Sequence, residues 1–272
     1  MSTATVLQRQ IHHRTNTPPA SLEGSELVGF YERSYTTAQP ADAERYARWR
    51  ALGAVAKADH VVALCARAGI APASTLDVGC GDGALLAELH RKGFGGRLRG
   101  VEIASAAVAI ARERTAIEAV ALFDGATLPF ADGAHDLGVL SHVLEHVVAP
   151  EALLAEVARA CRAVVVEVPL EANLSAGRAP KRRGAAAVGH LRRLDRRATR
   201  LIVERAGLAV AGELTDALSL NVQRFFAQTR RERALAGAKW AARAGLHRAS
   251  PSLARRLFTV HYACLCIPRR DG

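Results

Sequence analysis

Short apolar runs alternate with amphipathic stretches between residues 75 and 168, and this pattern predicts alternating strands and helices. Apolar runs are typical of buried strands, whereas apolar positions three and four residues apart are typical of helices. We expect strands at 75–79, 97–103, 118–123, 136–141 and 163–168, and helices at 82–92, 104–115 and 150–161. Strands and helices that alternate through short turns form right-handed βαβ units, so this part of the chain predicts a parallel sheet.

The flanking segments predict further elements of the same domain. Before the sheet, a long helix is expected over 40–69, because apolar positions keep helical spacing until Gly69 and Pro72. After the sheet, we expect a mobile loop at 171–189, a helix at 195–206, strands at 208–214 and 259–267, and a largely helical insertion over 218–256. The chain is therefore divided into a disordered tail (1–26), a helical cap (27–72), a sheet core (73–170) and a C-terminal part (171–272) of the same domain.

Three glycines spaced two residues apart follow the first expected strand. Gly79, Gly81 and Gly83 tolerate positive φ angles and allow a ligand to contact the backbone. The free N–H groups of such a turn and the N-terminus of the next helix favour phosphate-like and nucleotide ligands. Residues 79–84 also fit the loose dinucleotide pattern G-x-G-x-x-G/A. The glycines alone therefore predict a nucleotide-type site without identifying the ligand.

Acidic residues lie near the ends of three expected strands. Asp77 lies two residues before the first glycine, Glu102 lies 19 residues after Gly83, and Asp124 follows the third strand. A carboxylate placed like Glu102 accepts hydrogen bonds from two ribose hydroxyls, as it also does in NAD enzymes. The acids therefore support nucleoside binding.

Together these features resemble the class I S-adenosylmethionine (SAM) methyltransferases. The resemblance rests on residues 76–83, Glu102, residues 123–130 and residues 136–147, and it covers about residues 70–170. The chain is most similar to the small-molecule methyltransferases of ubiquinone and menaquinone biosynthesis. The resemblance implies a Rossmann-like three-layer α/β sandwich, with a mostly parallel seven-stranded sheet and an antiparallel last strand. The core at 73–170 would then bind SAM.

The resemblance also implies roles for individual residues. Asp77 would order the glycine turn and approach the methionyl amino group, Glu102 would hold the ribose, and Asp124 would receive the adenine amino group. The N-terminal helical cap would cover the cofactor. The residues expected to bind SAM are Asp77, Gly79, Cys80, Gly81, Gly83, Glu102, Ile103, Asp124, Gly125, Ala126 and Ser141.

Two histidines, His142 and His190, are candidate catalytic bases. In the family, the position of His142 lies near the sulfonium, and Gly-His segments like that of His190 lie near the substrate entrance. Residues 142–146 also match the zinc-protease pattern H-x-x-E-H. That pattern needs a helix and a third ligand, whereas these residues follow a buried strand, so we expect structural roles for Glu145 and His146 and no metal.

The net charge of +11 is concentrated in the C-terminal part of the chain. Residues 171–256 contain 19 Lys and Arg against 6 Asp and Glu, and the remainder contains 18 against 20. A cleft of one charge sign attracts ligands of the opposite sign. We therefore expect a small-molecule or lipid-linked anionic acceptor, methylated on oxygen or carbon in preference to nitrogen. Peripheral membrane contact stays open, and nucleic acid is a less favoured partner.

Two other functions stay open. An RNA methyltransferase would explain the isoelectric point of 10.2, although an appended RNA-binding module and the Asn/Asp-Pro-Pro-aromatic signature are both lacking. A SAM-binding partner protein without catalysis would keep the same glycines and acids. The five cysteines form no C-x-x-C pair, no apolar run reaches 18 residues, and the polar N-terminus lacks a signal peptide's apolar stretch. We expect a cytoplasmic protein without disulfides.

Overall fold

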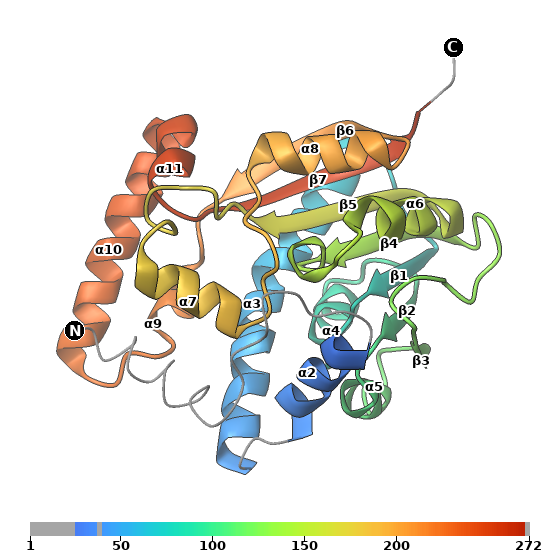
Figure 1. Cartoon of the computed structure of the whole chain (residues 1–272), viewed down its shortest axis with the longest axis horizontal. Helices are drawn as coiled ribbons and strands as arrows, with labels where there is room; N and C mark the ends of the chain where they lie inside the picture. The colour runs from blue at the N-terminus through green and yellow to red at the C-terminus, as the bar shows by residue number, and fades with distance from the viewer. Residues whose placement is uncertain (1–24, 37–39, 270–272) are drawn as a thin grey trace.

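The computed structural model describes residues 25–36 and 40–269. The tail expected to be disordered, 1–26, lies outside these ranges except for Ser25 and Glu26, which begin a helix. The described residues form a seven-stranded sheet with helices on both faces (Figure 1).

The strand order is β3-β2-β1-β4-β5-β7-β6, and β7 runs antiparallel to both of its neighbours. All other paired strands run parallel. This topology confirms the predicted Rossmann-like fold with an antiparallel last strand. The strands are β1 (Ser74–Val78), β2 (Arg97–Glu102), β3 (Ala119–Leu122), β4 (His135–Ser141), β5 (Cys161–Pro169), β6 (Leu208–Asp216) and β7 (His261–Pro268).

Burial explains why the central segments are strands. All five residues of β1 are buried, as are eight of the nine residues of β5, which lies between β4 and β7. Strands with helices on both faces need apolar side chains on both faces. In β5, Val164 and Val166 join the core on one face, whereas Ala163 and Val165 join the core on the other.

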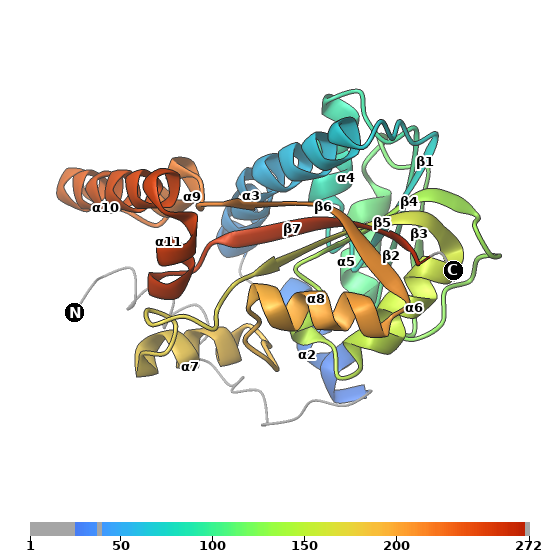
Figure 2. The same ribbon diagram turned by 90° about the horizontal axis from the view of Figure 1, so that it is seen from above.

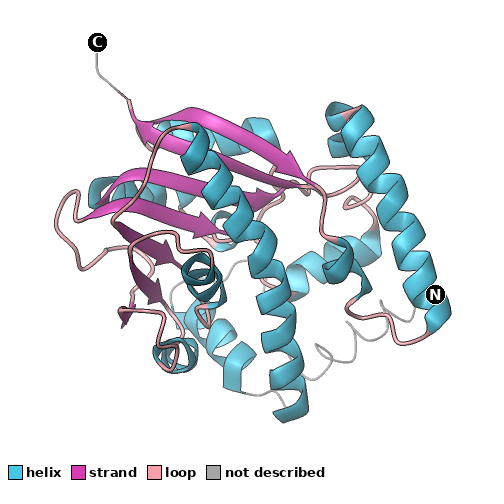
Figure 3. Cartoon of the chain, turned by 180° about the vertical axis from the view of Figure 1, so that it is seen from behind, coloured by secondary structure: helices cyan, strands magenta, loops and turns pink. Residues whose placement is uncertain are grey.

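The helices divide between the two faces. The core that contains Val165 packs against α3, α4 and α5, whereas the core that contains Val164 packs against α6 and α8 (Figure 2). Seen from behind, α3 runs across the sheet (Figure 3). The helices are α2 (Ser25–Thr36), α3 (Pro40–Arg67), α4 (Ala84–Arg91), α5 (Ser105–Arg112), α6 (Pro150–Ala160), α7 (Ala179–Ala187), α8 (Arg196–Arg205), α9 (Leu220–Arg224), α10 (Arg230–Ala249) and α11 (Pro251–Leu257), with a 3-10 turn at Leu144–His146.

Two helices differ from the sequence-based expectations. The segment expected to be a mobile loop, 171–189, contains α7, because Pro180 occupies its first turn and alanines, which are strong helix formers, fill much of the rest. A separate helix, α2, precedes the expected long helix α3. Both lie near the ends of β4 and β5 that carry the site. Within the described part of the chain, no helix combines the length and apolar character needed to cross a membrane.

Candidate active site

The glycine turn lies between β1 and α4. Gly79, Gly81 and Gly83 have φ angles of 75°, 55° and 75°, which side-chain-bearing residues rarely adopt. A Cβ atom on Gly79 would lie 2.8 Å from Cγ2 of Val143. The backbone N–H of Gly79 donates to the Val101 carbonyl oxygen at 2.8 Å, which joins the turn to β2. Glycine is therefore required both for the path of the turn and for its close contacts.

Glu102, the last residue of β2, accepts hydrogen bonds from the backbone of the glycine turn and from the two residues that follow Glu102 in the chain. Its Oε2 atom accepts a hydrogen bond from the Gly81 N–H at 2.9 Å, and its Oε1 atom accepts from Ile103 and Ala104 at 2.8 and 3.1 Å. Burial raises the pKa of this carboxyl, and the three N–H donors oppose that rise. The structure places Glu102 beside the turn, at the predicted edge of the sheet.

Asp77 and Cys80 both have buried side chains. Burial raises the pKa of Asp77 to about 7; the charge of Lys57 lowers it and that of Glu102 raises it. A carboxyl in this condition gains from an approaching ammonium group. The Cys80 thiol lies in the core below the turn, where a Cβ atom on Gly100 would lie 2.6 Å from its Sγ atom. Cys80 can therefore meet a ligand in the turn through its backbone.

Asp124 follows β3 and caps a turn. Its Oδ1 atom accepts hydrogen bonds from Ala126 and Thr127 at 2.8 and 2.7 Å. These bonds lower the pKa of the exposed carboxyl. The other carboxylate oxygen and the neighbouring Gly125, with φ of 86°, remain available for a ligand beside Ile103, whose Cγ2 atom lies 3.8 Å from a Cβ placed on Gly125.

Helix α2 covers the glycine turn, and the sequence did not indicate its role at residue level. A Cβ atom on Gly81 would lie 2.8 Å from the hydroxyl oxygen of Tyr35. The guanidinium of Arg50, from α3, lies 5.0 Å from the Tyr35 ring centroid and donates to Asp82 at 2.8 Å. The spacing of Tyr31 and Tyr35 is the one feature of the sequence that relates to this contact, because residues four apart place both rings on one helix face.

Ser141 and His142 end β4 at the same edge. The Ser141 Oγ atom is buried and has no hydrogen-bond partner among the described residues. His142 has a φ of 60°, and no other residue except glycine has a positive φ in the described part of the chain. Such backbone strain is typical of functional positions. Burial and the charge of Lys57 hold the pKa of His142 well below its ordinary value, so the ring is neutral at physiological pH.

The second predicted base, His190, belongs to a separate group of side chains. Its Nδ1 atom lies 2.7 Å from Oε2 of Glu171, and its ring packs edge-on against His146 with centroids 4.7 Å apart. Burial lowers the pKa of His190, but Glu171 raises it further, so it lies above the ordinary value. His146 also lies 2.6 Å from the Tyr31 hydroxyl. This contact fits the predicted structural role of His146 and joins α2 to the group.

Glu145 lies near both predicted bases, His142 and His190. Its Oε1 atom is 3.5 Å from Nδ1 of His142, and Glu145 also forms a close group with His146 and His190, with 3.9 Å from its Oε1 atom to Nε2 of His146. Burial raises the pKa of Glu145 to about 7, partly opposed by the charge of His190. Residues 144–146 form a 3-10 turn and not the α-helix of a zinc protease.

A cavity of about 450 Å³ continues from Glu171 toward α9 and α10. Glu171 lines it and also binds His190, so the cavity adjoins the histidines. Burial and the neighbouring charges of Arg243 and Lys239 lower the pKa of Lys181. The charged residues of the cavity wall are Glu171, Lys181, Arg193, Glu232, Lys239 and Arg243. The cationic groups outnumber the acids, which suits an anionic ligand.

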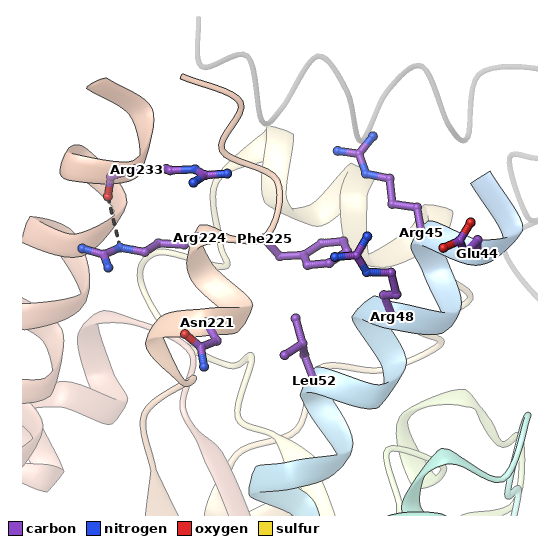
Figure 4. A pocket seen from close by; sticks show the side chains of 8 residues that line it. All are labelled: Glu44, Arg45, Arg48, Leu52, Asn221, Arg224, Phe225 and Arg233. Atoms are coloured by element: carbon purple, nitrogen blue, oxygen red, sulfur yellow. Dashed lines mark hydrogen bonds between the residues drawn. The ribbon is translucent and has the colours of Figure 1, made fainter. Parts of the chain in front are cut away.

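A larger hollow of about 620 Å³ lies on another side of α3 (Figure 4). Its arginines are Arg45, Arg48, Arg224 and Arg233, and Glu44 is its only acid. Arg48 and Leu52 face this hollow, whereas Arg50 on the same helix faces the glycine turn. The smaller cavity is the candidate acceptor site, because it alone of the two adjoins the histidines.

Residues 76–164 match the family model described as a methyltransferase domain. This segment includes the glycine turn, Glu102, Asp124, Ser141 and His142. No curated protein matches the chain.

Three solved structures share the fold. They are a possible histamine N-methyltransferase from Thermotoga maritima (14% identity, 89% of this chain and 100% of that chain, TM-score 0.59), geranyl diphosphate C-methyltransferase from Streptomyces coelicolor (17%, 79% and 77%, 0.56) and phosphoethanolamine N-methyltransferase 2 from Haemonchus contortus (13%, 77% and 52%, 0.53). At these identities the likeness establishes the class I methyltransferase fold, and the acceptors differ among the three proteins.

Residues 76–164 therefore form a methyltransferase domain, whose cofactor is S-adenosylmethionine. The residues present fit this group. The glycine turn offers a cradle that a Cβ atom would fill, the Ser141 hydroxyl is buried without a partner, and the carboxyl of Asp77 suits an ammonium.

Proposed function

We propose that the protein transfers a methyl group from SAM to a small anionic acceptor, on oxygen or carbon in preference to nitrogen. The observation that carries the proposal is the cavity of Lys181, Lys239 and Arg243, whose wall includes Glu171, the hydrogen-bond partner of the candidate base His190. Under this proposal, we assign the chain to the subgroup of small-molecule methyltransferases that act in ubiquinone and menaquinone biosynthesis. Lipid-linked anions belong to the acceptor class.

The cofactor would be held by three carboxylates and by the backbone of the glycine turn. Asp77 would face its amino group, Glu102 its ribose and Asp124 its adenine. When bound, SAM supplies a methyl group that the sulfonium charge already activates. Backbone contacts would come from Gly79, Cys80, Gly81, Gly83, Ile103, Gly125 and Ala126, with Ser141 offering its hydroxyl.

The chain's own contribution is to position the acceptor, exclude water and accept a proton. Helix α2 closes over the glycine turn through Tyr35, which keeps water from the reacting groups. The neutral ring of His142 can accept a proton from an acceptor hydroxyl. His190, with its pKa raised by Glu171, is the stronger base of the two and contacts Glu171 on the cavity wall.

Cofactor choice is the direct test of this assignment. Calorimetry with SAM, S-adenosylhomocysteine and NAD should show binding of the first two and none of NAD. The physical reason is that Asp124 and the turn after β3 offer one adenine site, with no site for a second nucleotide evident there. Micromolar NAD binding without a SAM signal would refute the proposal.

The protonation of His190 provides a second test that requires no acceptor. Because Glu171 raises its pKa, the Glu171→Gln variant should move the His190 titration to lower pH, as followed by its ring proton resonances. A base acts when neutral, so the acid limb of any activity profile governed by His190 should move the same way. His190→Asn identifies the resonance, and His247→Asn is the control. An unmoved titration would show that Glu171 does not tune His190.

Two experiments separate the proposal from its alternatives. Transfer of labelled methyl from SAM into a metabolite extract, but not into RNA, supports the small-molecule function. Transfer into RNA would favour the arginine-lined hollow of Figure 4 as the substrate surface. Tight SAM binding with no transfer into any acceptor class would indicate a non-catalytic SAM-binding protein.

A further inference from the structure

Glu167 is surrounded by three histidines from three different parts of the chain. Its Oε2 atom lies 3.1 Å from Nδ1 of His60, and its Oε1 atom lies 3.2 Å from Nδ1 of His261 and 3.5 Å from Nε2 of His142. The Glu167 side chain is only 1% exposed. A buried charge with this set of neighbours is a candidate metal ligand.

The fold accounts for this convergence. Glu167 lies in β5 on the face that α3 covers, and His60 belongs to α3. Pro169 of β5 pairs with His261 at the start of β7, so His261 is a diagonal neighbour of Glu167 on the same face. His142 follows β4, and its ring packs against that of His261 with centroids 4.7 Å apart.

Two atoms of the group have no hydrogen-bond partner despite their burial. Oε1 of Glu167 and Nε2 of His142 are both unsatisfied among the described residues, although other polar atoms lie close. Buried polar atoms are nearly always paired, so an unpaired carboxylate oxygen facing an unpaired ring nitrogen calls for an explanation. A metal ion bound to Oε1 would satisfy the carboxylate.

Two of the histidines have a carboxylate at the opposite ring nitrogen. Nε2 of His60 lies 3.3 Å from Oδ2 of Asp216, and Nδ1 of His142 lies 3.5 Å from Oε1 of Glu145. Metal-binding histidines commonly donate the other ring N–H to a carboxylate, which fixes the ring and its tautomer. The hydrogen bond to Asp216 therefore orients the His60 ring so that Nδ1 faces Glu167.

We propose that His60, Glu167 and His261 bind a divalent transition-metal ion. Their ligand atoms, one from each residue, lie within 4.8 Å of one another. Tetrahedral zinc with bonds of about 2.0–2.2 Å holds its ligand atoms roughly 3.3 Å apart. The distances from Glu167 Oε2 to His60 Nδ1, 3.1 Å, and from Glu167 Oε1 to His261 Nδ1, 3.2 Å, are close to this spacing.

The donor set identifies the class of ion. Two imidazoles and one carboxylate suit Zn²⁺ or a neighbouring transition metal, whereas Mg²⁺ and Ca²⁺ prefer oxygen ligands. The carboxylates of Glu167 and Asp216 balance the charge of the ion. No metal was predicted from the sequence, and these three ligands are far apart in the chain and belong to no spaced motif.

The test measures metal on tag-free protein. After loading with Zn²⁺ and desalting, elemental analysis should find close to one ion per chain, and added Co²⁺ should give the visible absorption of a four-coordinate site. Glu167→Gln and His261→Asn should abolish both signals. Asp216→Asn, which removes only the partner of His60, should weaken Co²⁺ binding about 10- to 100-fold.

Matched variants control for folding and for other sites. His247→Gln alters a histidine bound to Thr215 and should keep full binding. His190→Asn tests the other histidine group, of Glu145, His146 and His190, and should also keep it. Zn²⁺ should raise the unfolding temperature of the wild type and of His247→Gln, but not of Glu167→Gln. Absence of metal from the folded wild type, or loss of binding in His190→Asn with retention in Glu167→Gln, would overturn the proposal.

Discussion

Replacing Glu102 by alanine should weaken SAM binding by about 2–4 kcal/mol, which is a roughly 30- to 900-fold rise in the dissociation constant. Under the proposed function, the carboxylate accepts charge-assisted hydrogen bonds from the ribose. It also fixes the turn by accepting N–H bonds from Gly81, Ile103 and Ala104. The variant therefore loses both a ligand contact and the preorganised shape of the turn. Isothermal titration with SAM measures the change.

Two further variants distinguish these contributions. Glu102→Gln keeps one acceptor oxygen and the side-chain volume, so its loss should be smaller than that of Glu102→Ala. Glu113→Ala removes an exposed acid at the end of α5 and should bind like the wild type. A fall in unfolding temperature is expected for Glu102→Ala, because three backbone donors lose their acceptor. An unchanged dissociation constant in the folded Glu102→Ala protein would contradict the ribose role.

The sheet and the cofactor corner could be predicted because their signals are local. The run at 163–168 in β5 is nearly all apolar, and the three glycines and Asp77 lie within seven residues of one another in the chain. Glu102 and Asp124 end or follow parallel strands, and the carboxyl ends of parallel strands meet at one edge of a sheet. Sequence order and strand topology together therefore place these groups.

The packing of α2 over the glycine turn and the two histidine groups depend on tertiary contacts that the sequence pattern does not indicate. Tyr35 reaches Gly81 only because α2 folds back over the sheet edge. His60, Glu167 and His261 are each separated by about a hundred residues, and only pairing of β5 with β7 and packing of α3 bring them together. A periodic pattern identifies the face of each element, but not the residue that it meets.

The basic C-terminal part shows how composition alone can mislead. Its cations could be counted from the sequence, but their directions could not. The structure divides the run at 181–183: Lys181 lines the acceptor cavity, whereas Arg182 and Arg183 do not. Glu213 engages two other arginines of this part, Arg196 and Arg200, on the outer surface. The net charge therefore overstates the field that an acceptor would meet.

Replacing Lys181 and Arg243 together by serine should raise the apparent KM for the acceptor roughly 10- to 100-fold and leave SAM affinity unchanged. Both side chains line the cavity, and Arg243 is half-buried there, which strengthens its attraction for an anion. Loss of a hydrogen bond to a charged group costs about 1.5–3 kcal/mol, and incomplete screening within a Debye length of about 8 Å spreads the effect over both charges. Initial rates of labelled methyl transfer at rising concentrations of metabolite extract give the apparent KM.

The matched control is Arg182→Ser with Arg183→Ser. It removes the same formal charge from α7, the helix that carries Lys181, but at positions that do not line the cavity. Exposed charges contribute little at moderate salt, so this pair should change KM by less than about twofold. Added salt should raise KM for the wild type and have a smaller effect on the cavity variant, because the attraction that salt screens is already gone. If both double variants behave alike, the charge of the whole segment acts as a general field, and the cavity does not select the acceptor. If neither differs from the wild type at low salt, the acceptor is not recognised through its negative charge.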